Sequence, residues 1–144
     1  MQAYLFFALG IFYKVVNIML LDENESDFAK RINDLDVAVN VVKSTYLNQD
    51  APSCINCVLD LSILIKSIRL VWARYLNEQD KKQFYNMLSV IVDSIKQYAN
   101  FAKQIDANSK CTENIEYVCG KAEALGMSLK KLNSKSASNQ FCIF

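Results

Sequence analysis

The chain has 144 residues, of which 52% are apolar and 22% are charged, and its formal net charge is +1. This composition indicates one globular domain rather than a disordered chain. A net charge this close to zero gives no basic surface for nucleic acid, so nucleic acid is not an expected partner. The chain has no histidine and no nucleotide-binding or nucleophile motif, and we therefore predict a protein that is not an enzyme and carries no cofactor or metal.

The first 21 residues are strongly apolar, and Lys14 is their only charged side chain. A secretory signal peptide has a core of this kind, although no basic residue precedes this core and no A-x-A cleavage site follows it. Lys14 and Asn17 interrupt the span of about 20 residues that a membrane helix needs, so we expect no stable membrane insertion after processing. We predict a signal peptide over residues 1–21 and a mature chain that begins between residues 11 and 24. A buried first helix over residues 3–21 is the alternative.

Residues 22–134 carry the apolar spacing of helices. Large apolar residues recur at steps of three and four, which places them on one face of a helix. Four stretches show this pattern: 28–46, 54–75, 84–105 and 111–132. With three glycines and one proline, the chain lacks the turn residues that a β-sheet protein of this size needs.

The breaks between the stretches follow from local chemistry. Ser26 is the expected N-cap of the first helix, and Pro52 ends the connection that follows it. Asn77 is expected to end the second helix in a left-handed conformation, and one continuous helix over 53–107 is the alternative. Thr112 is the expected cap of the fourth helix, and residues 135–144 are expected to form a flexible tail.

The expected buried series can be written residue by residue. The first is Phe28, Ile32, Leu35, Val39, Val42 and Tyr46, and the second is Cys54, Val58, Leu61, Ile65, Ile68, Trp72 and Tyr75. The third is Phe84, Leu88, Ile91, Ile95, Tyr98, Ala102 and Ile105, flanked by Met87, Val90 and Phe101. The fourth is Cys111, Ile115, Val118, Ala122, Leu125, Leu129 and Leu132, with Gly120 and Gly126 as points where a neighbour approaches closely. Four such helices with short links predict an all-α, antiparallel up-down-up-down four-helix bundle.

The cysteines give the main chemical hypothesis. Cys54 and Cys57 begin the second helix, and Cys111 and Cys119 begin the fourth, so an up-down arrangement places all four at one end of the bundle. Two disulfides are expected there, and we favour Cys54–Cys111 with Cys57–Cys119, although other pairings are open. Reduced core cysteines of a cytosolic protein are the alternative. Cys142 is left over and is expected to be a free thiol or to form an intermolecular bridge.

These features predict a small secreted glycoprotein that acts by binding, such as a cytokine-like, salivary or reproductive-tract factor. Asn24 begins an N-glycosylation sequon just after the apolar segment. The expected partner is a protein or receptor, and a small apolar ligand is the second class. The alternative function is an intracellular, cytoplasmic interaction module, of the kind that a virus or parasite uses to modulate its host. It holds a partner helix in a groove and keeps residues 3–21 as a core helix.

Overall fold

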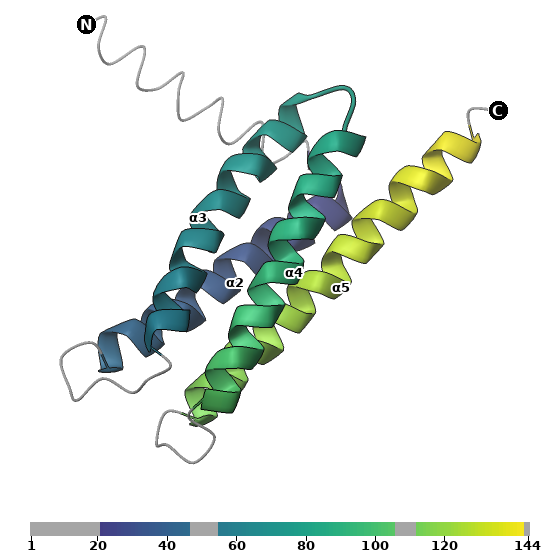
Figure 1. The fold of residues 1–144 in the computed structure, drawn as a ribbon. Helices are drawn as coiled ribbons and strands as arrows, with labels where there is room; N and C mark the ends of the chain where they lie inside the picture. The colour runs from purple at the N-terminus through teal and green to yellow at the C-terminus, as the bar shows by residue number, and fades with distance from the viewer. Residues whose placement is uncertain (1–20, 47–54, 106–111, 143–144) are drawn as a thin grey trace, which may run out of the picture.

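The computed structural model describes residues 21–46, 55–105 and 112–142 of the chain. This part is all helical, with α2 (Glu23–Tyr46), α3 (Ile55–Asn77), α4 (Lys82–Ile105) and α5 (Thr112–Cys142). Successive helices reverse direction, so the predicted four-helix bundle is confirmed (Figure 1). Among these four helices, none combines the length and the hydrophobicity that a membrane crossing requires.

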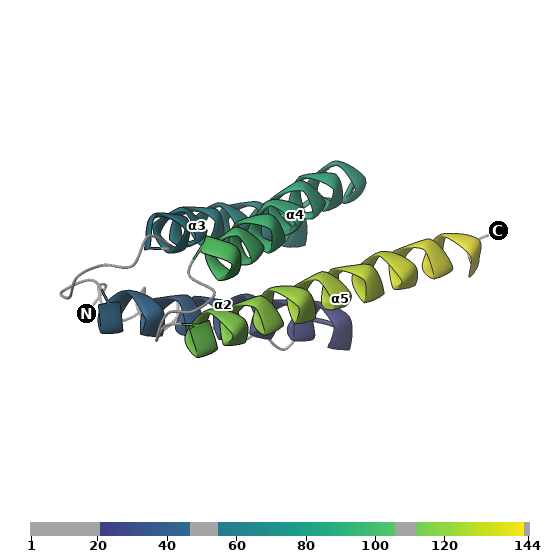
Figure 2. The same cartoon turned by 60° about the horizontal axis from the view of Figure 1, so that its bottom comes forward.

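The helices form two layers. α3 packs on α4 in one layer, α2 packs on α5 in the other, and the core lies between them (Figure 2). The α4–α5 and α2–α3 pairs also pack closely, so α3 lies diagonally across the bundle from α5, and α2 from α4. The starts of α3 and α5 lie at the same end of the bundle, as the up-down topology predicts (Figure 1).

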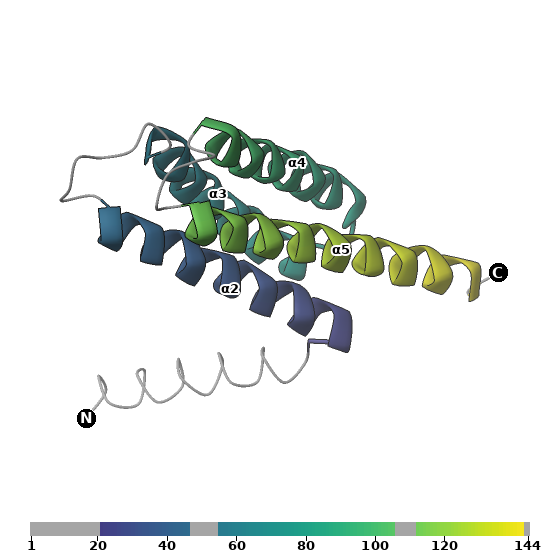
Figure 3. The same cartoon turned by 90° about the horizontal axis from the view of Figure 1, so that it is seen from below.

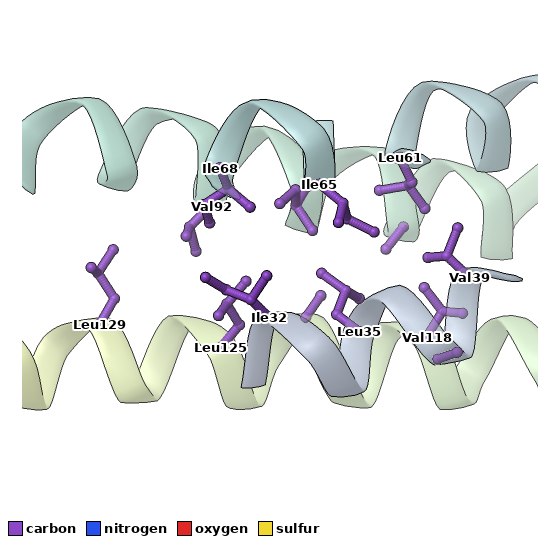
Figure 4. Close-up of a cluster of buried hydrophobic side chains, with 14 of the residues drawn as sticks. Ile32, Leu35, Val39, Leu61, Ile65, Ile68, Val92, Val118, Leu125 and Leu129 are labelled. Carbon is purple, nitrogen blue, oxygen red and sulfur yellow. The ribbon is translucent and has the colours of Figure 1, made fainter. Parts of the chain in front are cut away.

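The expected buried series of α2, α3 and α5 is confirmed wherever the structure describes the side chain. Their buried members are Phe28, Ile32, Leu35, Val39, Val42, Val58, Leu61, Ile65, Ile68, Trp72, Tyr75, Ile115, Val118, Ala122, Leu125, Leu129 and Leu132. Many of these side chains point into the space between the two layers (Figure 4). At one end of the core the Trp72 ring lies 4.8 Å from the Phe28 ring and stacks at 5.2 Å on Tyr75.

Helix α4 departs from the expected series. Its buried residues are Leu88, Val92, Ile95, Ala99 and Ala102. Tyr98 and Ile105, predicted to be buried, are 37% and 50% exposed, so this part of the prediction was wrong. The sequence pattern favoured large side chains, whereas the packed face uses the small Ala99, whose carbonyl oxygen accepts a hydrogen bond from Cys119 Sγ of α5 at 3.3 Å.

The start of α2 also differs from the prediction. Asp22 is the N-cap, because its Oδ1 accepts a hydrogen bond from the Glu25 backbone nitrogen at 2.8 Å. The Asp22 backbone nitrogen in turn donates to Glu25 Oε1 at 3.4 Å, which completes a capping box. Ser26 lies inside the first turn, where its backbone nitrogen donates to the Asp22 carbonyl oxygen at 2.9 Å. The predicted Ser26 cap was therefore wrong.

The turn between α3 and α4 falls where the sequence predicts it. α3 ends at Asn77 and α4 begins at Lys82, so the alternative of one helix over 53–107 is wrong. No described non-glycine residue has a positive φ, so Asn77 is not left-handed. Its side-chain amide instead donates to the Ala73 carbonyl oxygen at 3.0 Å. Asp80 Oδ1 accepts from the Lys82 backbone nitrogen at 3.3 Å and starts α4.

Helix α5 is the longest element and extends past the start of α4 (Figure 3). It continues through residues 135–142, for which the sequence predicts a flexible tail. Gly126 lies under the side chain of Lys96 from α4, and a Cβ there would meet Lys96 Cε at 2.7 Å. Gly120 has no described atom of a neighbour within 4 Å of that position. Only Gly126 therefore marks a close approach.

Candidate functional site

Helix α4 carries a second apolar face outside the core. Its large members are Met87, Val90, Tyr98, Phe101 and Ile105, which are 41%, 66%, 37%, 54% and 50% exposed. Together with the half-buried Ser94 we call them the α4 stripe. Because a helix turns by about 100° per residue, these six residues fall within an arc of about 80°, centred about 120° from the buried face.

The surface beside the α4 stripe holds few charges. On the flank away from the core, the exposed residues are Lys82, Asn86, Asp93, Gln97, Asn100 and Gln104, of which only Lys82 and Asp93 are charged. Lys96 lies on the opposite flank, where its Nζ is 3.8 Å from Glu123 Oε2 of α5. A surface that has few charges and contains methionine and aromatic residues has the composition of a protein-contact surface.

A hollow lies at the start of α4, beside the first residues of the stripe. Its volume is about 640 Å³, and it is open to solvent. Its described lining is Asp80, Lys82, Gln83, Asn86, Met87, Val90 and Ile91. The hollow therefore lies in the same surface as the N-terminal half of the stripe, while Phe101 and Ile105 project from the C-terminal half.

The other exposed apolar side chains are less concentrated. Helix α3 adds Leu59, Ile63 and Leu70, on the side of the helix opposite its buried residues. The α2–α5 layer exposes Val37, Val41, Tyr117 and Met127, which are divided between its two helices. The α3–α4 layer thus presents the larger apolar surface, and the α4 stripe is its longest continuous part.

A polar cluster lies where the start of α2 meets the α3–α4 turn. Lys81 Nζ is 3.8 Å from Glu25 Oε2 and 4.8 Å from the centre of the Tyr75 ring. Burial raises the pKa of Glu25, and the neighbouring Asp22 carboxylate adds to that rise, while a backbone hydrogen bond and Lys81 oppose it. Burial, followed by the Glu25 charge, raises the pKa of Tyr75 to about 12. The cluster connects the start of α2, the end of α3 and the α3–α4 turn, so we assign these contacts to holding the fold together.

The structure describes the predicted cysteine site only in part. Cys54 and Cys111 lie outside the described residues. Cys57 and Cys119 are half-buried, and no disulfide joins them in the structure. They come from diagonal helices, whereas a disulfide needs Cα atoms within about 7 Å. The predicted pairs Cys54–Cys111 and Cys57–Cys119 stay predictions.

The thiol of Cys119 is a weak nucleophile in this setting. Burial raises its pKa, the nearby Glu116 and Glu123 add to the rise, and Lys103 opposes it. Cys142 is the last residue of α5, and its side chain lies outside the described set. Nothing in the structure tests whether it forms a bridge between molecules.

The remaining candidates lie on helix surfaces. Asn24 of the sequon is half-buried in the first turn of α2. Asp36 Oδ2 pairs with Arg69 of α3 at 2.9 Å, and this pair joins the two layers. Within the described ranges, no group of three or more cysteine, aspartate or glutamate side chains is arranged to hold a metal ion.

A scan against protein-family models and searches of curated proteins and of solved structures give no match. The α4 stripe is the feature that the sequence pattern did not identify. The sequence did contain a signal for it. Met87, Val90 and Phe101 extend the apolar residues of α4 round more of the helix than its contacts with the core can bury. Periodicity alone placed them beside the core.

Proposed function

We propose that this chain is a small secreted helical-bundle protein that acts by binding another protein through the α4 stripe. The exposure of that stripe is the observation that supports the proposal. Its exposed fractions correspond to about 400–500 Å² of apolar surface, which is within the range of about 300–600 Å² for the largest patch of a typical monomer, and such a patch is often functional. The core of the bundle is complete without these side chains, so folding alone does not explain them.

A protein partner fits this surface better than a small apolar ligand. A ligand site encloses most of its ligand, whereas the hollow at the start of α4 is open and continues into the exposed stripe. The stripe extends over about 27 Å at 1.5 Å per residue, which matches five turns of a partner helix. A binder of this kind needs a rigid helical scaffold and no chemistry on a substrate.

Secretion rests on different residues. The apolar segment over residues 1–21, the sequon at Asn24 and the four cysteines that the sequence predicts at one end of the bundle support it. One disulfide at that end, closing a loop of about 60 residues, would stabilise the scaffold by roughly 4 kcal/mol in the chain-entropy model. The intracellular interaction module, with residues 3–21 retained, would use the same α4 surface.

The first experiment expresses the full chain in a secretory host and takes the intact mass with and without reductant and alkylation. We expect a secreted product that begins between residues 11 and 24, with four cysteines that react only after reduction. An intracellular product that retains Met1 and offers five alkylatable thiols would contradict secretion. It would leave the intracellular module as the better account.

The second experiment tests the surface. Fluorescently labelled mature protein is bound to intact cultured cells, and unlabelled variants compete with it. We expect the double variant Val90→Glu, Phe101→Glu to compete about tenfold less well than wild type. The matched control is Tyr117→Glu with Met127→Glu, two residues of α5 that are 60% and 62% exposed. Equal competition by both double variants would show that the stripe is not the contact surface.

A further inference from the structure

We infer that the protein bound at the α4 stripe is a second copy of this chain, packed antiparallel about a two-fold axis beside Ser94. The inference rests on the proposed function, since it names the partner of the same surface. A symmetric dimer requires one surface to complement itself. Each contact between two different residues then occurs twice, once on each side of the axis. The α4 stripe meets this requirement in its spacing, in its shape and at its midpoint.

The spacing of the stripe is the same in both directions from Ser94. Val90 and Tyr98 lie four residues away, and Met87 and Phe101 lie seven away. A two-fold axis beside Ser94 therefore places Val90 against Tyr98 of the second copy and Met87 against Phe101. Each of these contacts joins two apolar side chains, and each forms twice.

The shape of the surface is complementary under the same axis. The N-terminal half of α4 carries the hollow, which Gln83, Met87 and Val90 help to line. The C-terminal half projects Phe101 and Ile105, which are 54% and 50% exposed. Gln83 and Ile105 both lie eleven residues from Ser94, so the projecting half of one copy falls on the hollow of the other.

The midpoint suits a close crossing of two helices. Ser94 is the smallest residue of the stripe, so the two backbones approach most closely there. Its Oγ already donates to the Val90 carbonyl oxygen at 3.0 Å. Burial of Ser94 in a dimer would therefore leave no unsatisfied hydroxyl, which would otherwise oppose association.

The available area is close to that of a stable dimer. Each copy contributes about 400–500 Å² of apolar surface from the stripe. The neutral side chains of Asn86, Gln97 and Asn100 line the outer flank and add polar area. The sum approaches the value of about 800 Å² per partner that standard interfaces bury.

The charge of Asp93 distinguishes a symmetric dimer from a complex with an unrelated partner. A two-fold axis beside Ser94 brings Asp93 of both copies onto the same flank, close to the axis, where the two carboxylates repel each other. Both are exposed, so solvent and salt weaken the repulsion without removing it. Neutralising Asp93 should therefore strengthen self-association, whereas an unrelated partner gives no reason for such an effect.

The test is sedimentation equilibrium of the mature full-length protein, over a wide concentration range and in 150 mM salt, at about physiological ionic strength. A Cys142→Ser background removes any disulfide-linked dimer. We expect a concentration-dependent dimer that Val90→Glu weakens by about tenfold or more and that Asp93→Asn tightens by up to about twofold, with the larger effect at low salt. Met127→Glu, on the opposite layer, should leave it unchanged, and circular dichroism checks that each variant is folded.

A wild-type protein that stays monomeric, or a dimer that Val90→Glu does not weaken, would overturn the inference. A dimer that Asp93→Asn weakens would overturn the two-fold axis at Ser94.

The proposed function and this inference can fail independently. If the protein is monomeric but stripe variants lose cell binding, the proposed function stands and the partner is a different protein. If it dimerises through the stripe but binds no cell in competition, the inference stands without the wider function.

Discussion

Lys81 shows how a single side chain connects segments that are far apart in the sequence. Its ammonium group lies between the Glu25 carboxylate at the start of α2 and the Tyr75 ring near the end of α3. Tyr75 in turn stacks on Trp72 in the core. Glu25 therefore serves two purposes, since it completes the capping box with Asp22 and faces Lys81. Its raised pKa shows that partial burial outweighs these favourable contacts.

Substitutions of Glu25 should separate the contribution of its capping hydrogen bond from that of its charge. Because its pKa is raised in the folded state, its favourable contribution is present below the ordinary value of 4.5 and is lost as the pH rises through the folded pKa. Glu25→Gln keeps the cap without the charge, so at pH 7 it should match or exceed wild type by at most about 1 kcal/mol. Glu25→Ala should lose about 1 kcal/mol, because the capping box is broken. Urea unfolding at pH 7 and pH 4 measures both, and a Gln variant less stable than the Ala variant would contradict this account.

The two glycines of α5 give a matched pair. Gly120→Ala meets no described atom of a neighbour and should stabilise the protein by about 0.5–1 kcal/mol, since alanine favours the helix. Gly126→Ala should gain less, because its Cβ displaces the flexible end of Lys96 and disturbs the Lys96–Glu123 pair. Thermal unfolding of both variants tests this order. A larger gain at Gly126 would show that Lys96 does not lie over α5.

At the scale of elements, α4 separates what hydrophobic periodicity predicts from what it does not. In α2, α3 and α5 every described member of the predicted series is buried, so a single series is enough. In α4 they diverge after Ile95, where Ala99 and Ala102 are buried and the larger Tyr98, Phe101 and Ile105 are exposed. The prediction for α4 was wrong because it assumed that the larger side chains are buried. Where two helices pack closely only small side chains fit, and the larger ones lie on the external surface. Periodicity carries no information on which of two adjacent apolar faces turns inward.

A pair of identical substitutions on α4 tests the observed register. Val92 is 2% exposed and points into the core, whereas Val90 is 66% exposed (Figure 4). Val92→Ala should cost about 1–3 kcal/mol of unfolding free energy, from lost burial and the cavity left behind. Val90→Ala should change stability by less than about 0.5 kcal/mol in dilute monomer. Denaturant unfolding at low protein concentration measures both, and equal costs would mean that α4 is rotated from the position described.

At the scale of the whole molecule, the number of helices and their alternating directions followed from the sequence, because breaks at Pro52 and Asn77 and three short links leave few topologies. The pairing into two layers did not follow, since apolar spacing does not say which neighbouring helices pack most closely. The sequential order of an up-down bundle makes α3 and α5 diagonal in either hand, which bears directly on whether Cys57 and Cys119 can meet. The cap of α2 was missed for a local reason, because the Asp22 carboxylate and Glu25 three residues later satisfy two backbone groups reciprocally, which Ser26 does not do.

The cap at Asp22 also bears on how the chain would mature. Among the described residues, the ladder of backbone hydrogen bonds in α2 begins at Asp22, whose carbonyl oxygen accepts from the Ser26 backbone nitrogen. An aminopeptidase acts on an unpaired, extended terminus and should slow where this ladder begins. If residues 1–21 are the leader that the sequence predicts, removal at any of several upstream positions would leave the same described bundle, with ragged ends that differ only in length. Such a domain would need no sharply defined cleavage site, and the apolar segment of this sequence offers none.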